Sequence, residues 1–89
     1  MIYTILFIEN GRVINFRAFS NYNRAKNRVE MLLERLRKEY KECEGFNAEE
    51  VESLKQMDSG DVEDGFYFHF LFSNERKQIE VVFLSGDLD

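Results

Sequence analysis

Apolar and aromatic residues dominate two segments near the start of the chain, residues 2–8 and 12–19. Asn10-Gly11 lies between them and favours a two-residue type I′ turn, which needs positive φ at both positions. The pattern predicts a β-hairpin over residues 2–19. Pairing outward from the turn would give one wholly apolar face toward the core, with the pairs Phe7–Ile14, Ile5–Phe16 and Tyr3–Ala18.

A helical period follows this hairpin. Apolar side chains recur three and four residues apart and form one stripe, made of Tyr22, Ala25, Val29, Leu32, Leu33, Leu36, Tyr40 and Cys43. Ser20 and Asn21 are candidate N-caps, and Gly45 supplies a stop, so we expect a long amphipathic helix over residues 21–44. A capping-box pattern from Asn47 then predicts a short second helix over residues 48–57.

The last third of the chain predicts a second hairpin. After an acidic loop at residues 58–65, every second residue of 66–72 is Phe, and a further apolar strand follows within the hairpin 66–85. The pattern therefore predicts that residues 1–89 form a single α+β domain with the element order ββα(α)ββ. Its four-stranded, mainly antiparallel sheet would carry the long helix on one face. Because 66–72 has so little charge, we expect it to be a central strand or to pair with a copy of itself, and 12–19 to form an edge.

Composition narrows the class of protein. The 89 residues hold 17 acidic and 12 basic side chains, one Cys, one His and no Pro, for a net charge of −5. One cysteine excludes an intrachain disulfide scaffold and a multi-cysteine zinc module. The longest apolar run, residues 1–8, is far below the roughly 20 residues that cross a bilayer and does not read as a signal peptide. We expect no membrane association and a cytoplasmic protein, in the host cell cytoplasm if it is viral.

No motif points to catalysis. His69 alternates with phenylalanines and has no nucleophile or carboxylate at a suggestive spacing, so a structural or interface role is expected. Cys43 lies on the apolar stripe, where a thiol packs as a small hydrophobe. The acids of the loop 58–65 do not match the calcium-binding loop of an EF-hand. We therefore expect a protein that is not an enzyme, with no catalytic residue, metal ligand or cofactor.

The second face of the sheet is the first candidate binding surface. One helix covers one face only, and the other would expose an apolar set interrupted by Thr4, Asn15, Arg17, His69 and Glu80. Either the second helix and the acidic loop close this face, or another chain covers it. We favour another chain, as a homodimer or a target protein. The expected interface residues on this face are Leu6, Val13, Tyr67, His69, Leu71, Val82 and Leu84.

Charge is segregated along the chain. Residues 1–41 carry nine bases and four acids, whereas residues 42–64 carry one base and nine acids. The acids predict a surface that docks on a basic groove of a protein partner such as a nucleic-acid enzyme. Its residues would be Glu42, Glu44, Glu49, Glu50, Glu52, Asp58, Asp61, Glu63 and Asp64.

The basic residues support an alternative function. A set around the start of the long helix would bind phosphate groups together with the free amides of the helix N-terminus. The set is Arg12, Arg17, Arg24, Lys26 and Arg28. The net charge of −5 weighs against a long nucleic acid and leaves a nucleotide as the better ligand.

In size, absence of motifs and acidic charge, the chain resembles the small accessory inhibitors carried by phages and mobile elements, including anti-CRISPR and anti-restriction proteins. This resemblance implies a small intracellular protein that inhibits or regulates a macromolecular partner through its acidic surface. It transfers no residue. The nucleotide- or nucleic-acid-binding module remains the alternative.

Overall fold

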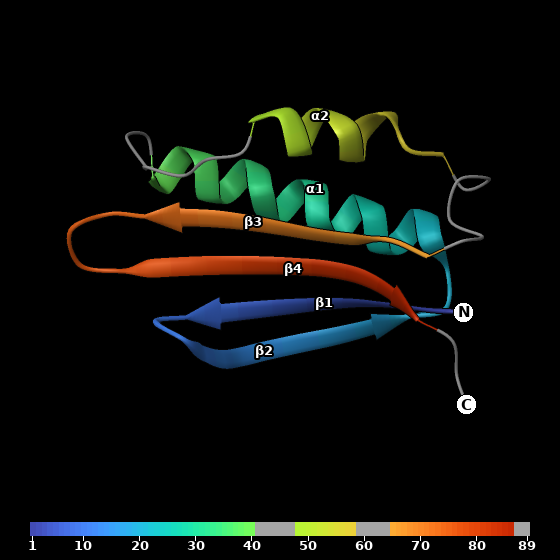
Figure 1. The fold of residues 1–89 in the computed structure, drawn as a ribbon, viewed down its shortest axis with the longest axis horizontal. Helices are drawn as coiled ribbons and strands as arrows, with labels where there is room; N and C mark the ends of the chain where they lie inside the picture. Colours follow the sequence, from blue (N-terminus) through green and yellow to red (C-terminus); the bar gives the residue numbers. More distant parts are fainter. Residues whose placement is uncertain (41–47, 59–64, 87–89) are drawn as a thin grey trace.

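The computed structural model describes residues 1–40, 48–58 and 65–86. Two hairpins flank two helices, which confirms the α+β class and the expected element order (Figure 1). The elements are β1 (Ile2–Glu9), β2 (Arg12–Phe19), α1 (Tyr22–Glu39), α2 (Ala48–Gln56), β3 (Tyr67–Ser73) and β4 (Gln78–Gly86).

The sheet is antiparallel throughout and has the strand order β2-β1-β4-β3. The hairpins join through β1 and β4, and β2 is an edge strand as predicted. The expectation that the Phe-rich strand is central is wrong, because β3 forms the opposite edge. Helix α2 packs against β3, and the Phe70 and Phe72 side chains are 1% and 0% exposed. Covering an edge strand with a helix protects it against aggregation. Pairing of β3 with its own copy stays a prediction.

Helix α1 begins where the sequence indicates. Asn21 is its N-cap, with the Asn21 side chain accepting a hydrogen bond from the Arg24 amide at 3.1 Å. The helix ends at Glu39, before the predicted residue 44, because the Tyr40 backbone (φ −114°, ψ 62°) departs from helical values. The centre of the Tyr40 ring lies 6.4 Å from the centre of the Phe72 ring. Residues 41–44 lie outside the described part of the chain.

Helix α2 lies beside α1 and is tied to it at one end. It ends at Gln56, one residue before the predicted end. The Tyr22 hydroxyl and the Lys26 ammonium both donate to the Met57 carbonyl, at 2.9 and 2.7 Å. The last carbonyls of a helix lack partners within it, so these two donors satisfy a backbone group that would otherwise need water.

One apolar core fills the space between the sheet and both helices. It combines residues of the sheet and of both helices: Ala25, Val29, Leu33 and Leu36 of α1, Val51 and Leu54 of α2, and Ile5, Phe70, Val81 and Phe83 of the sheet. Since α2 contributes to this core, it lies on the same side of the sheet as α1 and does not close the second face. The loop at residues 59–64, which could also have done so, is outside the described residues.

The first hairpin has the predicted turn and a different register. Asn10 and Gly11 have φ of 49° and 83°. A β-bulge then shifts the pairing, so the predicted pairs Phe7–Ile14, Ile5–Phe16 and Tyr3–Ala18 are wrong. The observed pairs are Phe7–Asn15, Ile5–Arg17 and Tyr3–Phe19.

This shift has a physical reason. The bulge adds Ile14 as an extra residue and turns every later β2 side chain to the other face. It brings Phe19, in place of Ala18, opposite Tyr3, where Phe19 packs against the core. It also moves Arg17 to the helix side and Phe16 to the second face.

Candidate functional site

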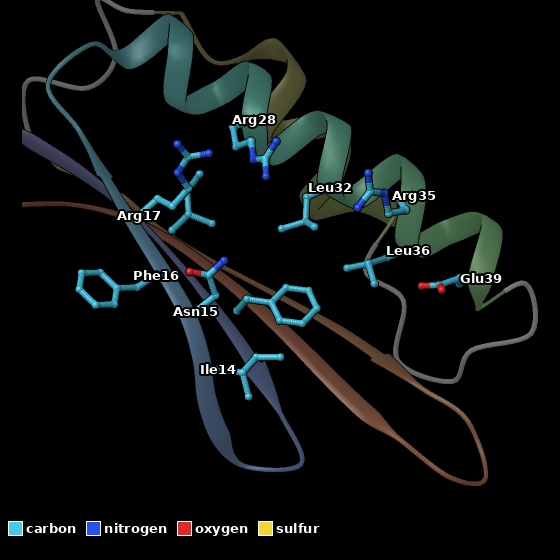
Figure 2. A pocket seen from close by; sticks show the side chains of 11 residues that line it. Ile14, Asn15, Phe16, Arg17, Arg28, Leu32, Arg35, Leu36 and Glu39 are labelled. Atoms are coloured by element: carbon cyan, nitrogen blue, oxygen red, sulfur yellow. The ribbon is translucent and has the colours of Figure 1, made fainter.

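A cleft of about 490 Å³ lies between β2 and α1. Helix α1 begins next to the end of β2 and diverges from it along the sheet, so the cleft is open and wedge-shaped (Figure 2). Strands β1 and β2 and helix α1 line it with Ile5, Phe7, Ile14, Asn15, Phe16, Arg17, Arg28, Leu32, Arg35, Leu36 and Glu39.

The cleft has an apolar base that belongs to the margin of the core. Ile5 of β1 and Leu36 of α1 are 4% and 3% exposed, and Phe7 and Leu32 are half-buried against the same cluster. Because these side chains are held by packing, the base is rigid before any ligand arrives. It offers a preformed apolar surface, as most small-molecule sites do.

Three arginines surround this base. Arg17 reaches in from β2, while Arg28 and Arg35 lie seven residues apart on α1 and so share one helix face. Figure 2 shows Arg17 and Arg28 at the end where helix and strand meet, and Glu39 at the opposite end. Among the described residues, none of the three arginines forms an ion pair. The Arg17 guanidinium carbon lies 5.6 Å from the centre of the Phe19 ring, a cation–π contact that holds Arg17 toward the helix side.

The chemistry of these groups suits the binding and orientation of a ligand. Guanidinium groups recognise phosphates and carboxylates through paired N–H donors, and they keep their positive charge at all physiological pH values. Among the described residues that line the cleft, Glu39 is the one carboxylate, and none carries a thiol, hydroxyl, imidazole or amine. The cleft therefore suits an anion with an attached apolar part.

The predicted phosphate-binding residues fall into two groups. Arg17 and Arg28 come together at the cleft. Arg12 pairs in register with Glu9 near the turn, and Arg24 is an exposed residue one helical turn before Arg28. Lys26 donates to the Lys55 carbonyl in the last turn of α2 and to the Met57 carbonyl just after it, and thus has a structural role.

Sequence reasoning missed Arg35. The available signal was its seven-residue spacing from Arg28, which places both on one face of a helix. The side chain of Arg17 on the helix side could not be foreseen, because it depends on the bulge.

Most of the predicted acidic surface lies outside the described residues, namely Glu42, Glu44, Asp61, Glu63 and Asp64. Of the remaining four, Glu49, Glu50 and Glu52 belong to α2 and Asp58 follows it. Glu52 lies 4.0 Å from Lys55 in an exposed ion pair. The acidic partner-binding surface stays a prediction.

The predicted sheet-face residues do lie together. Leu6, Val82 and His69 are neighbours in one row across β1, β4 and β3. The adjacent rows contain Leu84 with Tyr67, and Val13 with Leu71. The expectation that Asn15 and Arg17 also interrupt this face is wrong, since the bulge puts Phe16 and Ala18 there instead.

A metal site finds no support in the described part of the chain, where no three His, Cys, Asp or Glu side chains are grouped. Cys43 is not among the described residues. No helix between residues 1 and 40 or within 48–58 is long and apolar enough to span a membrane. Comparison with protein families, with curated proteins and with solved structures finds no match to the chain.

Proposed function

We propose that the cleft between β2 and α1 binds a nucleoside phosphate and that the protein is a non-enzymatic ligand-binding module. One observation carries the proposal. Three arginines surround the preformed apolar floor of a cleft that is large enough for a small ligand. They are Arg17, Arg28 and Arg35, and none of them has an ion-pair partner among the described residues. A cleft of about 490 Å³ falls within the range of small-molecule sites.

The arrangement of charge gives the ligand a direction. The phosphate lies at the end formed by Arg17 and Arg28, where two guanidinium groups supply parallel N–H donors. The nucleobase of the ligand rests on the apolar surface of Leu32 and Leu36. An exocyclic amine of the base donates to the Glu39 carboxylate at the far end. Adenine, cytosine and guanine carry such an amine, and uracil does not.

A single nucleotide fits better than a nucleic acid strand. General attraction to a polynucleotide comes from a broad basic surface, and this chain has a net charge of −5. Three exposed arginines, Arg17, Arg28 and Arg35, gather at the cleft, where they would meet one or two phosphates. Local charge of this kind raises the affinity for a small anion without attracting a long backbone.

Isothermal titration calorimetry with AMP, adenosine and inorganic phosphate tests the proposal. We expect AMP to bind, and each fragment to bind about tenfold or more weakly because it loses either the arginine contacts or the apolar contact. UMP should bind less tightly than AMP. The proposal would be wrong if no nucleoside phosphate bound at millimolar concentration.

A matched pair of arginine variants locates the site. R28Q should weaken AMP binding about tenfold or more, because a hydrogen bond to a charged group contributes about 1.5–3 kcal/mol. R24Q changes an exposed arginine on the same helix that does not line the cleft, and should bind AMP as the wild type does. Equal loss in both variants would point to general electrostatics rather than to the cleft.

A further inference from the structure

We propose that the second face of the sheet is a dimer interface, on which a second copy of this chain packs face to face. The inference does not rest on the nucleotide proposal, because the cleft opens on the helix side of the sheet and stays accessible in such a dimer; among the described residues, Phe16 alone belongs both to this face and to the lining of the cleft. It commits to a homodimer and not to a foreign protein.

The face is more apolar than a regular hairpin would have made it. The bulge places Phe16 opposite Leu6, and takes Arg17 off this face. Phe16 is 66% exposed, and Val13 and Tyr67 on the same face are 57% and 67% exposed. These three are half of the large apolar side chains that are exposed in the described residues. Such a concentration on one surface typically marks an interaction site.

The described helices leave this face open. Val51 and Leu54 of α2 belong to the core on the opposite side, together with the buried residues of α1. Along the face, Leu6, Leu71 and Leu84 remain half-exposed although they lie in the middle of paired strands. A sheet with one uncovered apolar face is stabilised by packing on another sheet, at a separation of about 10 Å.

Charge favours a second copy as the occupant. The only ionisable side chains of the Asp, Glu, Lys, Arg and His types that the described strands place within the face are His69 and Glu80. They bond to each other, with 2.8 Å between His69 Nε2 and Glu80 Oε1. The one carboxylate on the described part of this face thus has a hydrogen-bond partner within its own copy, and repulsion between rows of like charges, which opposes self-association of a face, is absent from these strands. A partner selected by charge would need a charged surface here.

The area is sufficient for a two-fold dimer. Four strands about 4.8 Å apart, each about 25 Å long, present a flat area of roughly 500 Å² per copy, without the extra surface that protruding side chains add. Two copies then bury about 1,000 Å² in total, which reaches the lower bound for a specific interface. A two-fold axis uses the same patch on both copies, so a uniformly apolar face is complementary to itself.

Sedimentation velocity across the micromolar range tests the dimer. We expect a concentration-dependent species of twice the 10.6 kDa monomer mass. Phe16 lies on β2 and Tyr67 on β3, at opposite edges of the same face. F16E and Y67E should therefore each shift the protein to the monomer, since both edges are buried when two faces pack.

M31E is the matched control. Met31 is 63% exposed on α1, away from this face, so M31E adds the same charge to an equally exposed apolar residue and should leave the dimer intact. Circular dichroism confirms that each variant is folded. A wild type that is monomeric throughout, a dimer that survives both F16E and Y67E, or a dimer lost in only one of the two would overturn the proposal. The last result would indicate pairing along one sheet edge.

Discussion

Strands β4 and β2 belong to the same sheet and have similar shares of apolar residues, yet the middle of β4 is buried and almost all of β2 is exposed. In β4 the helix-facing residues Ile79, Val81 and Phe83 are 3%, 0% and 0% exposed. In β2 every residue from 12 to 18 is exposed, and Phe19 alone is half-buried. The difference lies in what covers each strand, because α1 diverges from β2 (Figure 1), whereas the helix-facing side chains of β4 belong to the core that both helices line. Burial of a strand is set by its neighbours more than by its own composition.

We therefore expect the regions around the two strands to contribute differently to stability and to binding. Around β4, an aromatic cluster supplies cohesion, including Phe66, whose ring centre lies 4.7 Å from that of Phe83. Around β2, exposed apolar residues and arginines are available to ligands and partner chains. Stability should come from the first region and binding from the second.

The largest expected effect comes from truncating the covered region. F83A removes a fully buried ring and should lower the free energy of unfolding by about 3–5 kcal/mol, through lost transfer energy and the cavity left behind. I14A, at the exposed bulge residue of β2, should change it by only about 0.5 kcal/mol. Urea denaturation followed by circular dichroism measures both. Similar losses in the two variants would break the comparison.

A smaller effect separates two tyrosines. Y22F removes the hydroxyl that donates to the Met57 carbonyl in the partly buried junction of α1 and α2, and should cost about 1 kcal/mol. Y67F removes the hydroxyl of a ring that is 67% exposed and should leave stability unchanged. The same denaturation assay compares them. A larger loss in Y67F than in Y22F would contradict the division of stability between covered and exposed parts of the molecule.

The smallest effect is expected at an exposed ion pair between β1 and the turn that joins β3 to β4. The Glu9 carboxylate accepts a hydrogen bond from Lys77 at 2.9 Å and so raises the pKa of Lys77. A raised pKa in the folded state gives stability below the unfolded pKa of about 10.4, and this stability is lost as pH rises through the folded value. The difference in unfolding free energy between wild type and K77Q should shrink as pH passes from 9 to 11. A difference that grows over that range would contradict a raised pKa of Lys77 in the folded state.

Much of the fold could be predicted because its signals are local. Asn10-Gly11 determines a tight turn through backbone sterics, and Asn21 caps α1 through a bond to a residue three positions away. The apolar stripe of α1 needs only the helical period. These features depend on a few neighbouring residues, which a sequence displays directly.

The candidate site depended on features that are not local. The bulge at Ile14 decides which face Arg17 occupies, and its benefit is the packing of Phe19 on the core. The edge strand β2 has one neighbour, so its register is less constrained than that of β4. The position of β3 at an edge likewise depends on α2 packing against it. Spacing within the chain carries none of this information.

A titration followed by amide NMR tests the central claim most directly, which is that the open β2 side of the sheet is the ligand-binding region. Addition of AMP should shift amide resonances of β2 and of the cleft-facing residues Arg28, Leu32 and Arg35, and leave those of β3 and the middle of β4 in place. Shifts concentrated on β3 and β4, or none at saturating AMP, would contradict it.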